Sequence, residues 1–143
     1  MANEQLKDLI RRMFDAFERG DYQALERIMS PAFVEHEDVG PGVPRTREGV
    51  IQWLKGMRQA FPDLHFDPEH ISVDGDTVWV RGQVSGTQRG DFMGMPASGK
   101  SFEVGFLDEL RCDRNQIVEH WGQVDAMGMM QQLGLVQMSR VQR

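Results

Sequence analysis

The sequence predicts an α+β fold in which a curved antiparallel sheet wraps around three helices from the N-terminal half. Apolar residues recur every three or four positions in roughly the first sixty residues, a pattern typical of amphipathic helices. From there on they alternate with polar residues, which is typical of strands. Helices followed by hairpin strands favour α+β over a doubly wound sheet. The 143 residues are about the usual size of one domain, so we expect residues 1–143 to form a single unit.

The helices are predicted from their apolar stripes and their caps. Residues 5–18 carry one continuous apolar stripe and form the first helix. Asp21 is the predicted N-cap of a short second helix, and Thr46 is the predicted N-cap of a third, which Pro62 ends. A final helix of about eight residues ends at Gly134.

The strands are predicted from alternation and turn signals. A short first strand covers residues 32–36 and leads into a loop rich in glycine and proline. Asp74-Gly75 between apolar runs is a strong hairpin signal, and Asp113-Arg114-Asn115 is predicted as the three-residue loop of a second hairpin. The four long strands are predicted over residues 64–73, 77–87, 101–112 and 116–125.

Composition excludes several classes of function. The net charge of −6 argues against nucleic acid as a partner, because a phosphate backbone attracts clustered lysine and arginine. No apolar run approaches the roughly 20 residues that span a bilayer, so we expect no membrane association. The single cysteine excludes an internal disulfide and cysteine-rich zinc sites. We therefore expect a cytoplasmic protein with no cofactor and no metal.

Asp108 is the residue whose predicted position conflicts most with its chemistry. It shares its face of the strand with an apolar set: Phe102, Val104, Phe106, Leu110 and Cys112. A carboxylate on an apolar face is costly unless it is paired or protonated. With a loop of three residues, Asp108 lies directly opposite His120, close enough for a hydrogen bond. This pair is predicted to be either an acid–base dyad or a self-satisfied buried pair.

Other residues are predicted to complete a site around this pair. His36 ends the first strand, where a polar side chain can reach the mouth of a cavity. Its acidic neighbours Glu35, Glu37 and Asp38 allow a metal-site hypothesis, which we do not adopt. Gly122 lies beside the pair. The predicted pocket wall, for which ordinary core packing is the alternative, consists of Trp53, Phe61, Phe92, Met95 and Phe106.

Four segments resemble the SnoaL-like polyketide cyclases and ester cyclases: RRMFDAFERGDYQALERIMSPAFVEH, AFPDL, GDFMGMPASGKSFEV and IVEHWGQVDAMGMMQQLG. The resemblance runs in order over nearly the whole chain. It implies the cone-shaped fold of ketosteroid isomerase, with one apolar pocket and cofactor-free acid–base work on a polyketide. It also implies a homodimer or higher homo-oligomer joined through the outer face of the sheet, where Trp121 is predicted to lie.

The chain departs from the cyclase pattern at two positions. His120 matches the family's last-strand histidine, and His36 or Glu35 matches a polar pocket position. The cyclases carry a catalytic aspartate two residues after that histidine, where this chain has Gly122, and a histidine where this chain has Asp108. The acid and the imidazole are therefore rearranged, which puts ring closure of an anthracycline-type substrate in doubt.

Three functional hypotheses follow. In the first, Asp108 or His120 removes a proton next to the carbonyl of a small hydrophobic compound, and its partner or His36 stabilises the enolate, as in a cyclase, isomerase or aldolase. The second is epoxide hydrolysis of the limonene epoxide hydrolase type. This requires an arginine in the site, whereas Arg81 is predicted on the opposite face of its strand. The third is a non-catalytic module that binds a hydrophobic ligand.

Overall fold

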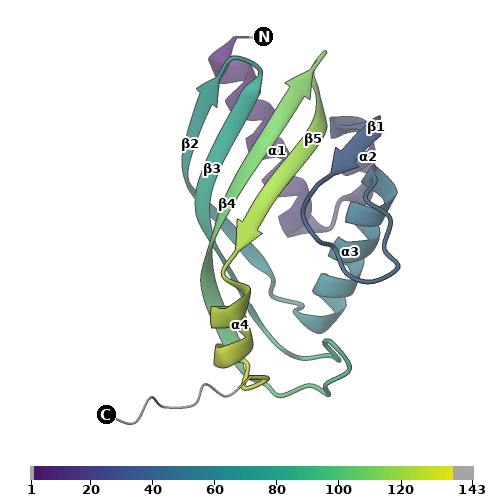
Figure 1. Cartoon of the computed structure of the whole chain (residues 1–143), viewed down its shortest axis with the longest axis vertical. Coiled ribbons are helices and arrows are strands. Elements are labelled where there is room, and N and C mark those ends of the chain that lie inside the picture. The colour runs from purple at the N-terminus through teal and green to yellow at the C-terminus, as the bar shows by residue number, and fades with distance from the viewer. Residues whose placement is uncertain (1, 137–143) are drawn as a thin grey trace.

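The computed structural model describes residues 2–136 and shows one curved sheet with helices packed against it (Figure 1). The helices are α1 (Asn3–Arg19), α2 (Tyr22–Ile28), α3 (Arg47–Ala60) and α4 (Ala126–Gln132). The strands are β1 (Met29–Glu35), β2 (His65–Asp74), β3 (Thr77–Thr87), β4 (Ser101–Asp113) and β5 (Gln116–Val124). The predicted α+β class is confirmed. Residue 1 and residues 137–143 of the predicted domain lie outside the described residues.

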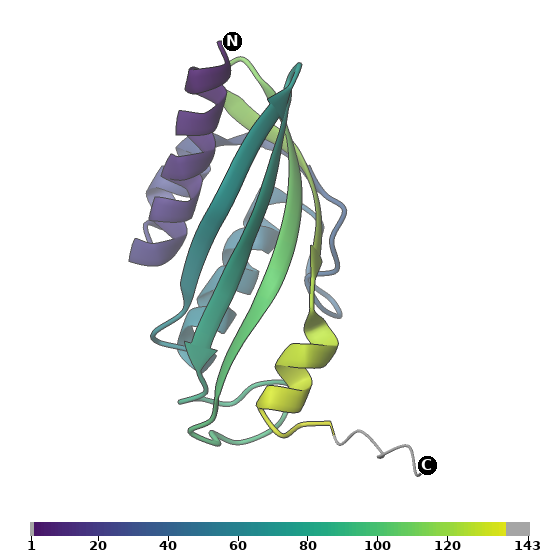
Figure 2. The same ribbon diagram turned by 90° about the vertical axis from the view of Figure 1, so that its left-hand side faces the viewer.

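The helices form where their caps and apolar stripes predict them. The side chains of Asp21 and Thr46 accept hydrogen bonds from the backbone N–H groups of Ala24 and Gly49, so both predicted N-caps are confirmed. α1 ends at Gly20, whose φ of 62° is a left-handed conformation that glycine adopts without steric cost. Figures 1 and 2 show α1, α2 and α3 on one side of the sheet, and α4 next to the end of β5.

The sheet has the strand order β1-β5-β4-β3-β2, with antiparallel pairing throughout β2 to β5. The edge strand β1 differs from the expected antiparallel sheet, because it pairs with β5 in parallel. Most of the chain separates these two strands, so no hairpin fixes their relative direction. Alternation of apolar residues is the same in either direction, and the sequence pattern therefore could not reveal it.

The turn between β4 and β5 is tighter than predicted. Its loop contains only Arg114 and Asn115, both with positive φ (51° and 62°), and Asp113 pairs with Gln116. These angles are those of a type I′ turn, whose twist suits a two-residue hairpin. A bulge follows between Arg111 and the next residue of β4 and leaves one residue of β5 unpaired. The predicted three-residue loop is wrong. Beyond the bulge, however, the side chains of β5 point to the predicted faces of the sheet.

The core lies between the helices and the concave face of the sheet. Phe61, which closes α3, is fully buried, and its ring lies 5.1 Å from the rings of Phe92 and Phe102. A second aromatic group joins α1 to the sheet and consists of Phe14, Phe17, Phe66 and Phe106. None of the helices in the described part of the chain is both long enough and apolar enough to cross a membrane.

Substitution of Phe61 tests this packing. We expect Phe61→Ala to lower the free energy of unfolding by about 3–5 kcal/mol, because it leaves a cavity between two aromatic rings. Urea unfolding followed by circular dichroism measures the change. Met127→Ala is the control, because this side chain is 54% exposed and its loss is expected to change the free energy by about 0.5 kcal/mol or less. Equal losses in the two variants would contradict the assignment of Phe61 to the core.

Candidate functional site

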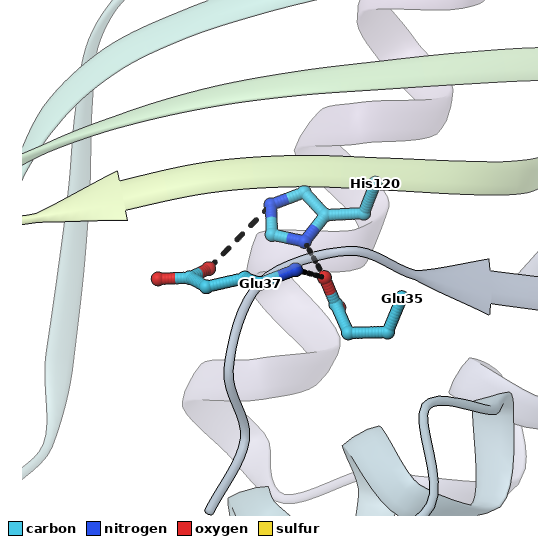
Figure 3. A group of neighbouring side chains, drawn as sticks. All are labelled: Glu35, Glu37 and His120. Atoms are coloured by element: carbon cyan, nitrogen blue, oxygen red, sulfur yellow. Dashed lines mark hydrogen bonds and ion pairs between the residues drawn. The ribbon is translucent and has the colours of Figure 1, made fainter.

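A cluster of ionisable side chains lies where β1, β4 and β5 meet. It consists of Glu35, Glu37, Asp108 and His120, and we call it the acidic cluster; Figure 3 shows three of its members. The imidazole of His120 lies at its centre. Its Nδ1 is 2.6 Å from Oε1 of Glu35, and its Nε2 is 2.8 Å from Oδ1 of Asp108. The histidine therefore bridges two carboxylates from different strands.

The sheet register brings these groups together. Glu35 and His120 are neighbours in the parallel β1–β5 pair, and Glu35 is only 4% exposed. Asp108 lies directly opposite Gly122, and His120 directly opposite Leu110, so the predicted direct opposition of Asp108 and His120 is wrong. The two residues are instead diagonal neighbours on the same face, which their side chains can span. The predicted contact is thus confirmed, and its predicted geometry is corrected.

Glu37 joins the acidic cluster from the loop that follows β1. Its backbone N–H donates a hydrogen bond to Oε1 of Glu35, and its own Oε2 lies 4.0 Å from Nε2 of His120 (Figure 3). Arg45 supports this loop by donating a hydrogen bond to the backbone carbonyl of His36. Sequence reasoning gave Glu37 no role in the site beyond a metal hypothesis. Parity with Glu35 points Glu37 to the inner side, but its approach to His120 depends on how the loop folds back over β5.

The environment shifts the pKa values of two members in the same direction. Burial lowers the pKa of His120, but hydrogen bonds to Asp108 and Glu35 and the charges of both outweigh burial and raise it to about 10. Burial raises the pKa of Glu37 to about 7; the charge of His120 opposes this shift, and the charges of Asp108 and Glu35 add to it. At neutral pH His120 is therefore an imidazolium, and Glu37 is close to half protonated.

His36 does not join this cluster. Its ring stacks on Trp121 at 4.6 Å, and its Nε2 lies 2.7 Å from Oε2 of Glu119, on the outer face of the sheet. Successive strand residues face opposite sides, so Glu35 on the inner face places His36 on the outer face. Of the two alternatives for the polar position on the first strand, the structure brings Glu35 to His120. Strand parity could have separated the two alternatives from sequence.

The residues predicted to line a pocket do not form a single wall. Phe61 and Phe92 are in contact, whereas Phe106 packs in the aromatic group at α1. Trp53 is partly buried against the core, and Met95 is 47% exposed on its loop. A hollow of about 460 Å³ lies elsewhere, against α1 and α2, with charged side chains in its lining. The apolar pocket next to the acidic cluster remains a prediction.

Metal binding and epoxide hydrolysis are the two alternatives to proton transfer for this arrangement. Donor atoms of Glu35, Glu37 and His120 lie within 4.8 Å of one another, which is close enough for a cation. Coordination of a metal requires the lone pair of a neutral imidazole, so metal binding and the protonated bridge of His120 are alternative states of these residues. Arg81 lies 3.5 Å from Glu69, with a side chain that is 60% exposed, so it is not part of the acidic cluster.

The pH dependence of stability tests these charges. The pKa of His120 is raised on folding from 6.5 to about 10, so its contribution is fully present below pH 6.5 and is lost as the pH rises through the folded value. We expect the free energy of unfolding to fall between pH 6.5 and 9. We expect the loss to be on the order of 1 kcal/mol for each pH unit between these values. Urea unfolding at a series of pH values measures this slope.

The control for this prediction is His120→Gln, which keeps a polar side chain but removes the titrating group. We expect this variant to be less stable at pH 6.5 and to show a flatter pH dependence up to pH 9. A wild-type protein whose stability is constant or rises across this range would show that His120 is not held as a buried imidazolium.

Comparison with known proteins identifies the family of this chain. The family described as SnoaL-like polyketide cyclase matches residues 7–133. Aklanonic acid methyl ester cyclase DauD from Streptomyces sp. (strain C5) is 30% identical over 135 residues, which cover 89% of this chain and 80% of DauD. The structure of IdmH from Streptomyces antibioticus is 35% identical with a TM-score of 0.82, over 91% of this chain and 99% of that one.

TsrD from Streptomyces laurentii has the same fold, with a TM-score of 0.85 and 27% identity, and the match covers 95% of this chain and 99% of TsrD. The match to the family spans most of the sequence and includes β1, β4 and β5, which carry the acidic cluster. The resemblance inferred from the four sequence segments is therefore confirmed, and the chain belongs to the SnoaL-like polyketide cyclase family.

Proposed function

We propose that this protein is an acid–base enzyme of the cyclase type that acts without a cofactor on a small hydrophobic carbonyl compound. The observation that carries the proposal is the acidic cluster, in which His120 bridges Asp108 and Glu35 within hydrogen-bond distance. Proton abstraction next to a carbonyl needs a base and a group that stabilises the enolate. The family description, SnoaL-like polyketide cyclase, and the name of aklanonic acid methyl ester cyclase DauD support a cyclase reaction on a polyketide.

The charges in the acidic cluster indicate which residue acts as the base and which stabilises the anion. An imidazolium has no lone pair, and both nitrogens of His120 are already engaged by carboxylates, so His120 is not the base at neutral pH. It instead supplies positive charge that stabilises the anion formed in the reaction. The base is then a carboxylate of the acidic cluster. Glu35 is nearly inaccessible, which leaves Asp108 and Glu37 to face the substrate.

A binding module without catalysis accounts less well for the acidic cluster. Placing three carboxyl groups that are at most 30% exposed around one imidazole costs desolvation energy that an apolar lining would avoid. Ionisable side chains that interact with one another and have shifted pKa values are typical of functional sites. We therefore propose catalysis rather than binding alone, with the polyketide-like carbonyl compound as substrate.

Turnover by variants of the cluster tests this proposal. The assay contains aklanonic acid methyl ester and a panel of aromatic β-keto esters, and chromatography measures loss of substrate and formation of cyclised product. We expect Asp108→Asn and His120→Ala each to lower kcat/KM at least 100-fold, which is typical for loss of acid–base catalysis. His70→Ala is the control, because His70 is exposed on β2, away from the cluster. Wild-type rates in both cluster variants would contradict the proposal.

We further propose that the protein is a homo-oligomer joined through the outer face of the sheet. Three large apolar side chains are exposed there on adjacent strands: Trp79 on β3, Leu107 on β4 and Trp121 on β5. Exposed apolar side chains gathered on one face are typical of interaction surfaces. His36 stacks on Trp121 and thereby belongs to this face rather than to the catalytic one.

The oligomer proposal is tested by analytical ultracentrifugation. We expect the wild type to sediment as a dimer or larger species and Leu107→Glu to sediment as a monomer, because a buried unpaired carboxylate opposes association. Met127→Glu, on α4, is the control and is expected to leave the wild-type species unchanged. A monomeric wild type would contradict this proposal without affecting the proposed chemistry.

A further inference from the structure

We propose that Glu37, a loop residue, is the group of the acidic cluster that takes the proton from the substrate and returns it, and that Gly122 provides the space for its carboxylate. This inference rests on the proposed function and specifies which side chain performs its central step. It is carried by the geometry around Gly122 and by the hydrogen bonds of the three carboxylates.

Gly122 is a position where a side chain would displace the cluster. A Cβ atom placed there would overlap Oε2 of Glu37 and would lie 2.8 Å from both Oδ1 of Asp108 and Cε1 of His120. The backbone of β5 is extended at this point, so the strand conformation does not require glycine. Glycine at this position therefore leaves room for Glu37, Asp108 and His120 to approach one another. Glu37 fills, from a loop, the space into which a side chain of β5 would otherwise project.

The three carboxylates differ in how firmly they are held. Asp108 and Glu35 each engage a nitrogen of His120 at hydrogen-bond distance. Within residues 2–136 no hydrogen bond to the carboxylate of Glu37 is found, and its nearest cationic atom is Nε2 of His120 at 4.0 Å. Its side chain is also the most exposed of the three, at 30%, against 15% for Asp108 and 4% for Glu35. Glu37 is thus the carboxylate that a substrate can reach and that is free to exchange a proton.

The environment of Glu37 also suits a group that both accepts and donates. Burial and the neighbouring carboxylates raise its pKa to about 7. A base with a pKa near the working pH is present in its active form and is still strong enough to remove a proton. Asp108 and Glu35, which are hydrogen-bonded to His120, balance its positive charge. The imidazolium is still close enough to stabilise an anion beside Glu37.

The reaction balances without any co-reactant. The carboxylate of Glu37 removes a proton from the carbon next to a carbonyl, and the C–H bonding electrons move onto the carbonyl oxygen to give an enolate. The enolate carbon then attacks a second carbonyl carbon of the same molecule, which forms the C–C bond and an alkoxide. Glu37 returns its proton to the alkoxide oxygen. The product is a ring isomer of the substrate, and Glu37 is regenerated as a carboxylate.

The experiment measures kcat/KM from pH 5.5 to 9 with the best substrate of the panel described above. We expect the wild-type rate to rise with pH through an inflection near 7, because only the deprotonated carboxylate of Glu37 is active. Glu37→Gln is expected to lose at least 100-fold and to lack this inflection. The matched control is Asp38→Asn, the next residue of the same loop; its Oδ1 accepts a hydrogen bond from the N–H of Gly40, which an asparagine can retain. We expect this control to keep the wild-type rate and inflection.

A relocation experiment separates a carboxylate that reacts from one that only shapes the site. Glu37→Ala removes the loop carboxylate, and Gly122→Asp in the same chain supplies another from β5 at the vacated position. We expect Glu37→Ala to lose at least 100-fold and the double variant to recover at least 10-fold of that loss, with a new inflection in the pH profile. Circular dichroism and thermal unfolding check that each variant folds. If the double variant fails to fold, Glu37→Asp replaces it as the test, and that variant is expected to retain more activity than Glu37→Gln.

The outcomes distinguish the two proposals. A wild-type enzyme that turns over no member of the panel overturns both. Turnover that is lost in Asp108→Asn but retained in Glu37→Gln to within 3-fold of the wild type overturns only the role of Glu37. An inflection near pH 7 that persists in Glu37→Gln also assigns that titration to another group and overturns this inference.

Discussion

The candidate site depends on one interaction, the bridge that His120 makes between Asp108 and Glu35. An imidazole with a carboxylate on each nitrogen holds its proton even when it is buried, because two charge-assisted hydrogen bonds outweigh the cost of desolvation. The bridge also ties the edge strand β1 to the middle of the sheet. Without the imidazolium, Glu35 and Asp108 would lose the cationic partner that they share in the described part of the chain, which is costly among apolar side chains.

A small irregularity in the β4–β5 hairpin maintains this bridge. The two-residue turn alone would shift β5 by one position relative to the predicted register, and such a shift moves a side chain to the other face of a sheet. The bulge after Arg111 compensates by leaving one residue of β5 unpaired, so that His120 and Asp108 share the inner face. The turn and the bulge together therefore decide which side chains meet.

A loop, rather than a strand, supplies one member of the acidic cluster. Gly122 lies two residues after His120 on β5. Glu37, from the loop after β1, occupies the space beside this glycine. The loop is supported by Arg45, which binds the backbone of His36 and thereby limits where Glu37 can lie. Loops tolerate substitution better than strands do, so a side chain supplied by this loop can change without altering the sheet.

The sequence by itself determined the α+β class, the helix caps at Asp21 and Thr46, and the inward position of Asp108. Each of these follows from local chemistry: a capping side chain binds its own helix, and strand parity is fixed within the strand. The family followed from the quoted segments, and the match to residues 7–133 confirms it. Parity also places His36 on the outer face once Glu35 faces inward.

Only the tertiary structure decided the parallel direction of β1, the bulge in β5 and the approach of Glu37 to His120. The direction of β1 and the approach of Glu37 join segments that are far apart in the sequence, and alternation carries no information about which strands become neighbours. The bulge lies within one hairpin, but alternation and turn signals do not reveal a residue that is left unpaired. The distribution of the predicted pocket aromatics over two separate groups was hidden for the same reason. Packing between distant elements, rather than any local preference, brings the carboxylates around one imidazole.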